Sequence, residues 1–153
     1  MIRDDLKQAL KDAMVAKDNH KVSTVRLILA AIKDRDIAAR GTAKDGVITD
    51  DDILQLLQSM IKQRKESIEM YNKGGRQDLV DAEQSEITII QAFLPQQMSS
   101  EEAEKAVREL VAEIGATNLK DMGKVMAALR EKYAGRMDFA QASATVKAVL
   151  AGS

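Results

Sequence analysis

Apolar residues recur at three- and four-residue spacing along most of this chain, which is the pattern of amphipathic helices. The spacing predicts a first helix over residues 3–17 and a second from Val22 to Ile37, separated by the turn formers Asp18-Asn19-His20. A third helix is expected from the N-cap Thr49 to Lys73, and a fourth from Gln77 to Phe93. No segment alternates apolar and polar residues over a strand length, so the pattern predicts an all-α protein.

A hinge is predicted in the segment Phe93–Glu102, which contains the one proline of the chain, Pro95. Proline disfavours the helical conformation of the residue before it, so the fourth helix should end at or before Leu94. Ser99 and Glu102 have the spacing of a capping box and should begin a new helix. The chain therefore divides into an amino-terminal helical domain, residues 1–94, and a carboxy-terminal domain, residues 95–153.

Three helices are expected in the carboxy-terminal domain. Their apolar faces run over residues 103–114, 119–133 and 139–150, and Gly115 and Gly135 should end the first two. The amino-terminal domain should form a helical bundle with a long hairpin that turns at Gly74-Gly75. Glycines at both ends of segment 41–46 predict a loop between the second and third helices.

The composition is that of a globular protein, with 45% hydrophobic and 31% charged residues in 153 and a net charge of −1. The absence of cysteine excludes disulfides and thiolate metal sites. The amino-terminal residues lack the apolar run of a signal peptide, and no stretch is apolar enough to span a membrane. These features predict a cytoplasmic protein without a membrane partner.

Few residues suggest catalysis. His20 is the single histidine, which excludes a two-histidine metal site, and we expect it in a solvated turn. The acids Asp50-Asp51-Asp52 suit the first turn of a helix better than a metal site. Nucleophile-elbow and dinucleotide-binding motifs are absent from the sequence. The sequence does not exclude a catalytic Ser–Lys pair, although nothing in it specifically supports one. We therefore predict no catalytic residue, no metal and no cofactor, and no self-sufficient enzyme.

Local charge is more informative, because residues 118–153 contain six basic and three acidic residues, whereas residues 99–117 contain two basic and five acidic residues. A basic unit of this kind can contact phosphates, although an ordinary mixed-charge surface explains the same counts. A glycine inside a helix costs about 1 kcal/mol relative to alanine, so Gly123 should mark the close approach of another helix or of a ligand backbone. The candidate phosphate contacts are Lys120, Lys124, Arg130, Lys132 and Arg136.

Four segments together resemble the YqeY-like (GatB/YqeY domain) family: Phe93–Glu102, Gly115–Met126, Val22–Ile28 and Arg64–Ile68. The segment Gly135-Arg136-Met137-Asp138 departs from the family pattern of Gly-Arg-Ala-Asp followed by Gly, which affects the start of the last helix.

The carboxy-terminal part is similar to the tail domain of GatB, a subunit of the glutamine-dependent aspartyl/glutamyl-tRNA amidotransferase. The positions that match the tail pattern are Gly123, Val125, Met126, Gly135 and Leu150. In that enzyme the tail helps to hold tRNA, and other domains perform the transamidation. The resemblance thus gives Met126, Gly123 and Gly135 a place in a motif, whereas Pro95 is expected to be a boundary.

Three functional hypotheses follow. The first, which the resemblance favours, is a non-catalytic protein that binds tRNA or associates with an amidotransferase or an aminoacyl-tRNA synthetase. The second is amidotransferase activity, a carbon–nitrogen ligase with glutamine as amide donor, by the chain alone or as an accessory subunit. The third is a protein–protein adaptor with a groove between its two domains.

Overall fold

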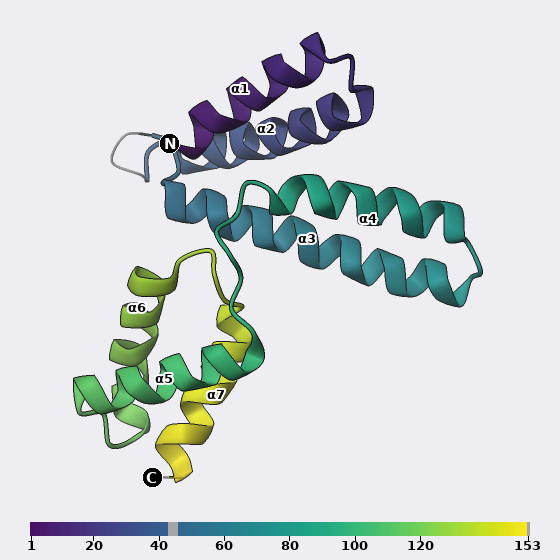
Figure 1. Ribbon diagram of the computed structural model, residues 1–153. Coiled ribbons are helices and arrows are strands. Elements are labelled where there is room, and N and C mark those ends of the chain that lie inside the picture. The colour runs from purple at the N-terminus through teal and green to yellow at the C-terminus, as the bar shows by residue number, and fades with distance from the viewer. Residues whose placement is uncertain (43–45, 153) are drawn as a thin grey trace. The chain divides into compact units, whose positions relative to one another are not determined.

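The computed structural model describes residues 1–42 and 46–152, and within these ranges all regular secondary structure is helical (Figure 1). The prediction of an all-α protein is confirmed. The part of the predicted loop at residues 43–45 lies outside the described residues. The helices are α1 (Ile2–Val15), α2 (Asn19–Ala39), α3 (Asp50–Lys73), α4 (Gln77–Gln91), α5 (Ser100–Ile114), the 3₁₀ turn η1 (Leu119–Asp121), α6 (Met122–Tyr133) and α7 (Phe139–Gly152).

The contacts of the chain divide it into two compact units, Met1–Pro95 and Gln96–Ser153, called here the amino-terminal and carboxy-terminal units. The division falls one residue after the boundary expected at Leu94, beside Pro95. That each unit folds as a domain by itself stays a prediction.

Local capping signals determine where several helices begin. The Thr49 hydroxyl accepts a hydrogen bond from Asp52 N at 3.2 Å, while the Asp52 carboxylate accepts from Thr49 N at 3.1 Å. Ser99 and Glu102 form the same reciprocal pair at the start of α5. Both arrangements are capping boxes, in which side chains satisfy amides that the helix leaves free. Asp138 likewise caps α7 by accepting from Ala140 N at 2.9 Å.

Two helix starts differ from the prediction. Asp18 caps α2, so His20 lies in the first turn of that helix, where its carbonyl accepts from the Thr24 hydroxyl at 3.1 Å. The turn is therefore shorter than expected, because one aspartate suffices to restart the helix. Asn118 caps the 3₁₀ turn η1 before α6 begins at Met122. Apolar spacing cannot separate that turn from the helix it precedes.

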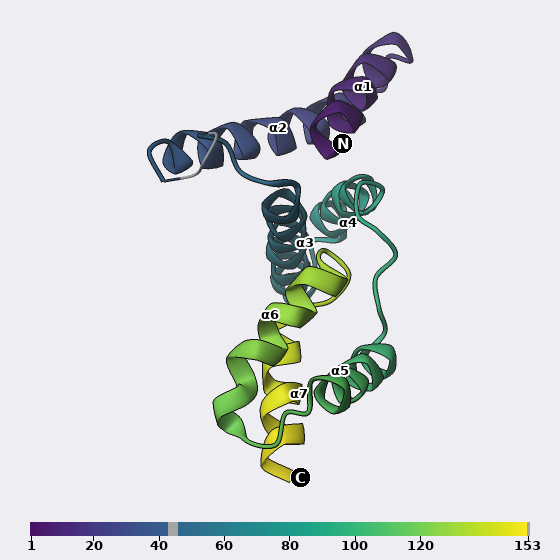
Figure 2. The same cartoon turned by 90° about the vertical axis from the view of Figure 1, so that its left-hand side faces the viewer.

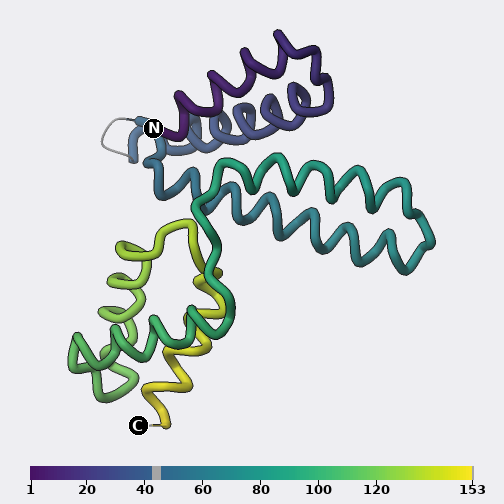
Figure 3. Tube along the Cα trace, viewed as in Figure 1, coloured from purple at the N-terminus to yellow at the C-terminus, as the bar shows by residue number. Residues whose placement is uncertain are grey.

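The amino-terminal unit consists of two helical hairpins, α1–α2 and α3–α4, which cross each other (Figures 1 and 2). The α3–α4 turn that follows Lys73 is seen in Figure 3. Eleven buried side chains form the core where the hairpins meet. They are Leu6, Val25, Ile28, Ile32, Ile53, Leu56, Leu57, Met60, Ile61, Ile87 and Ile90.

A charged node joins three parts of this unit. The Arg3 guanidinium donates to both carboxylate oxygens of Asp36, at 2.8 and 2.7 Å, and to the Ile48 carbonyl at 3.0 Å. Ile48 N donates to Asp36 at 2.9 Å. The hydrogen bonds from Arg3, assisted by the one from Ile48 N and opposed by burial, lower the pKa of Asp36 to about 2. The node connects the start of α1, the end of α2 and the approach to α3.

The carboxy-terminal unit packs α5, α6 and α7 around a second core, which also contains eleven buried side chains among the described residues. Gly115 ends α5 in the left-handed conformation with φ +77°, as its position predicts. The core residues are Ala106, Val107, Leu110, Val111, Val125, Met126, Leu129, Met137, Ala142, Val146 and Leu150.

Candidate functional site

The five candidate phosphate contacts do not gather in one cluster. Lys120 lies in η1 and Lys124 in the first turn of α6, whereas Arg130 and Lys132 lie in its last turn and Arg136 follows the helix. Since an α-helix rises about 1.5 Å per residue, the backbones of Lys124 and Lys132 are roughly 12 Å apart along α6. The five residues therefore form two groups, one at each end of the helix.

Aromatic rings accompany the group at the carboxyl end of α6. The Arg130 guanidinium lies 6.0 Å from the centre of the Phe139 ring. The Lys132 ammonium and the Arg136 guanidinium lie 5.6 and 5.9 Å from the centre of the Tyr133 ring. Cations at this distance are attracted to the ring when they lie over its face. These three side chains thus have a packing role at the end of α6, whatever else they contact.

Arg136 also takes part in a clasp, by which we mean the hydrogen bonds between residues 96–98 and 135–136. Its Nε donates to the Gln96 carbonyl at 3.2 Å, and Met98 N donates to the Arg136 carbonyl at 2.8 Å. The Gln97 amide donates to the carbonyl of Gly135, a buried residue whose φ of +74° suits glycine. The clasp fixes the first residues of the carboxy-terminal unit against the end of α6.

The other motif residues occupy different environments. Met126 is buried in the core of the carboxy-terminal unit, and Pro95 is exposed at the boundary. Gly123 is exposed in the first turn of α6, and a Cβ added there would meet no heavy atom within 4 Å. The expectation that another helix approaches Gly123 closely is therefore wrong, because its neighbours leave room for a side chain. The approach of a ligand backbone at this position stays a prediction.

A different surface, which the sequence did not single out, lies on the α3–α4 hairpin. No described residue from 62 to 86 is fully buried, although this stretch contains the second half of α3 and the first half of α4 (Figure 1). We call residues 62–86 the hairpin arm. The larger apolar side chains along it are the half-buried Ile68, Tyr71, Leu79 and Val80 and the 73% exposed Met70.

One ion pair marks the base of the hairpin arm. Arg64 Nε donates to the Glu86 carboxylate at 2.8 Å, and Arg64 Nη1 donates to the Met60 carbonyl at 3.1 Å. Both charged side chains are mostly shielded from solvent, with exposed fractions of 14% and 25%. Beyond this pair the two helices continue side by side to the turn that joins them (Figure 1), and Ile68 still packs against the core of the unit.

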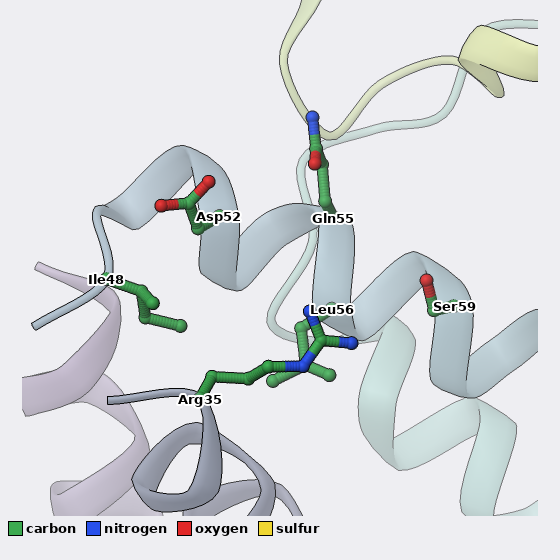
Figure 4. A pocket seen from close by; sticks show the side chains of 6 residues that line it. All are labelled: Arg35, Ile48, Asp52, Gln55, Leu56 and Ser59. Carbon is green, nitrogen blue, oxygen red and sulfur yellow. The ribbon is translucent and has the colours of Figure 1, made fainter. Parts of the chain in front are cut away.

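A pocket of about 280 Å³ lies between the end of α2 and the first turns of α3 (Figure 4). Its lining combines polar and apolar side chains: Arg35, Ile48, Asp52, Gln55, Leu56 and Ser59. The four residues from α3 fall on one face of that helix, since Gln55 and Leu56 each lie three or four positions from both Asp52 and Ser59. The sequence did not predict the pocket, because only the folded structure brings Arg35 and Ile48 beside the four residues of α3.

The described residues hold no group of three or more His, Cys, Asp or Glu side chains arranged to bind a metal ion. Asp50, Asp51 and Asp52 lie in the first turn of α3, as expected for charges at the positive end of a helix. Within residues 1–42 and 46–152, none of the helices has the length and apolar character needed to cross a bilayer.

The model of the family described as "Yqey-like protein" matches residues 3–150. The chain belongs to the YqeY-like family. Its curated relatives include proteins named "Altered inheritance of mitochondria protein 41, mitochondrial". The one from Lachancea thermotolerans is 40% identical over 126 residues, which cover 78% of this chain and 65% of the relative.

Two further relatives bear the same name. The protein from Vanderwaltozyma polyspora is 35% identical over 76% of this chain and 64% of its own length. A Saccharomyces cerevisiae protein (strain YJM789) is 38% identical over 60% of this chain and 47% of its own length. The chain thus spans about half to two thirds of the length of these relatives.

These names correct two expectations. The relatives are named for the inheritance of mitochondria and not for tRNA or amide transfer, so the predicted tRNA-binding or amidotransferase-associated function is wrong. Their names also describe them as mitochondrial, which contradicts the prediction of a cytoplasmic protein. The first error came from extending the role of a similar tail domain to the whole chain, and the second from reading location out of composition. Phosphate contact by the five basic residues stays a prediction.

Proposed function

We propose that this chain is a protein-docking member of the YqeY-like family, and that it binds a helical partner with the hairpin arm. The observation that supports this proposal is the absence of any fully buried residue among described positions 62–86, although apolar side chains recur along both helices. Two helices can cover each other on one side only, so the remaining apolar surface is available to a third.

The partner that fits this surface is an amphipathic helix. A helix that lies in a groove between two others contacts it through residues spaced three and four apart. Ile68, Tyr71, Leu79 and Val80 provide partly covered apolar surface, and Met70 adds a flexible, exposed side chain. Burial stabilises such a complex by about 25 cal/mol for each Å² of apolar surface removed from water, before the costs of association.

The charges of the hairpin arm suit such a partner. Residues 62–86 contain five basic and six acidic side chains, so the arm has no strong charge of one sign. Arg64 and Glu86 pair with each other, and the basic Lys62, Lys65 and Lys73 are exposed beside the acidic Glu66 and Glu69 on α3. A partner helix with both signs of charge beside its apolar stripe matches this rim better than a uniformly charged polymer does.

The names of the relatives support the choice of a process in which to test this proposal. Their shared name refers to the inheritance of mitochondria, which is a cellular trait and not a chemical reaction. Our proposal is that the chain and these relatives have a docking role in common, and that the hairpin arm carries it.

The experiment replaces the Saccharomyces cerevisiae relative by the present chain, fused to a mitochondrial leader, and scores inheritance of mitochondria in the daughter cells. Wild-type chain should restore inheritance. Met70→Glu should not, because a carboxylate on the arm opposes apolar docking. Val15→Glu is the matched control, since Val15 is 85% exposed on α1 and lies outside the arm.

The outcomes separate the parts of the proposal. Failure of the wild-type chain, present at normal level in mitochondria, would contradict a shared role. Full activity of the Met70→Glu variant would exclude the arm as the docking surface. Equal loss in the two glutamate variants, each shown by circular dichroism to be folded, would also count against the arm.

A further inference from the structure

We infer that the pocket between α2 and α3 binds a small zwitterion of the α-amino-acid class, with the ligand carboxylate on Arg35 and the ligand ammonium on Asp52. The inference is independent of docking by the hairpin arm, because all six lining residues lie outside residues 62–86. It rests on two opposite charges that share one pocket without pairing.

Arg35 is the cationic end of the site. Its side chain extends from α2 towards α3 (Figure 4), and it forms no ion pair with any residue in the described ranges. The neighbouring Asp36 is already engaged, because its carboxylate accepts hydrogen bonds from Nη1 and Nη2 of Arg3 and from Ile48 N. An unpaired guanidinium presents two parallel donors, which match the two oxygens of a carboxylate.

Asp52 is the anionic end. One of its oxygens accepts from Thr49 N in the capping box, which fixes the carboxylate in place, and the other oxygen accepts no hydrogen bond from the described residues. Asp52 is exposed at the start of α3. A fixed carboxylate of this kind is a suitable acceptor for an ammonium group.

Apolar side chains also line the pocket. Leu56 is buried and belongs to the core, and Ile48 is half-buried. Ser59 adds a hydroxyl on the same face of α3, one turn beyond Gln55. A pocket of about 280 Å³ has room for one amino acid but not for a nucleotide or a cofactor of that size. A compact ligand that has two opposite charges and an aliphatic side chain matches this lining.

The test uses the full-length chain and three related probes, followed by amide chemical shifts in nuclear magnetic resonance titrations. Leucine carries both charges, 4-methylpentanoate lacks the ammonium group, and 3-methylbutylamine lacks the carboxylate. We expect saturable shifts at residues of the pocket with leucine, and weaker binding of both single-charge analogues. Equal affinity for leucine and either analogue, or no saturable shift with leucine, would overturn the assignment.

Substitutions locate the two charges. Arg35→Gln should weaken leucine binding about tenfold or more, because a charge-assisted hydrogen bond is lost. Asp52→Asn retains an acceptor for Thr49 N and should weaken leucine more than 4-methylpentanoate. Arg26→Gln is the control, since Arg26 is an exposed arginine on the same helix outside the pocket. An effect of Arg26→Gln as large as that of Arg35→Gln would show that net charge, and not the pocket, governs binding.

Discussion

The two units of the chain differ in length, but their core clusters contain the same number of buried side chains. Each cluster contains eleven buried side chains among the described residues, but one serves Met1–Pro95 and the other Gln96–Ser153. The carboxy-terminal unit places its core along all three of its helices. The amino-terminal unit concentrates its core where two hairpins cross, which leaves the hairpin arm thinly packed. This difference in packing is the reason for proposing the hairpin arm, and not the carboxy-terminal unit, as the docking surface.

The largest expected effect compares two leucines. Leu129 is fully buried in the core of the carboxy-terminal unit, whereas Leu79 is half-buried on the hairpin arm. Leu129→Ala should lower the free energy of unfolding by about 2–5 kcal/mol, and Leu79→Ala by less than about 1 kcal/mol, because only the first leaves a cavity. Chemical denaturation of the full-length variants measures both. Equal losses would show that the arm is as well packed as the core.

A second effect concerns acid stability and the amino-terminal unit alone. The pKa of Asp36 is lowered to about 2, below the value of about 3.9 for an unfolded aspartate. Its contribution, about 1–2 kcal/mol, is therefore complete above about pH 4 and is lost as the pH falls towards 2. Asp36→Asn should remove this part of the pH dependence of unfolding. An unchanged slope between those pH values would show that the Arg3–Asp36 node does not stabilise the unit.

The smallest effects compare two glycines of the carboxy-terminal unit. Gly115 has φ +77°, so Gly115→Ala should destabilise by about 1 kcal/mol through backbone strain. Gly123 lies in a helix with open space around it, so Gly123→Ala should stabilise by up to about 1 kcal/mol. Thermal unfolding of both variants measures whether each substitution lowers or raises the stability of the chain. A destabilised Gly123→Ala chain would restore the idea of a close approach at that position.

Local signals explain which features the sequence could predict. Thr49, Ser99 and Asp138 determine helix starts through contacts within four residues, and each was predictable. The open space around Gly123 was not predictable, because helix propensity does not reveal which atoms lie beside a residue.

Features that depend on the fold were beyond sequence reasoning. Arg3 and Asp36 are separated by 33 positions, and the pocket joins residues of α2 and α3. The exposure of the hairpin arm was also not predictable. Apolar periodicity predicts the helices α3 and α4, but only the crossing of the two hairpins determines which half of each helix is covered.

Hydrogen exchange of the full-length chain tests the central comparison most directly. Amides of α3 from Glu66 to Tyr71 lie in the hairpin arm, and those of α6 from Val125 to Leu129 lie in the core of the carboxy-terminal unit. The arm should open locally, with an exchange free energy at least about 1.4 kcal/mol lower, or a tenfold faster exchange. Equal protection of the two segments would contradict the account of a thinly packed arm and with it the reason to propose docking there.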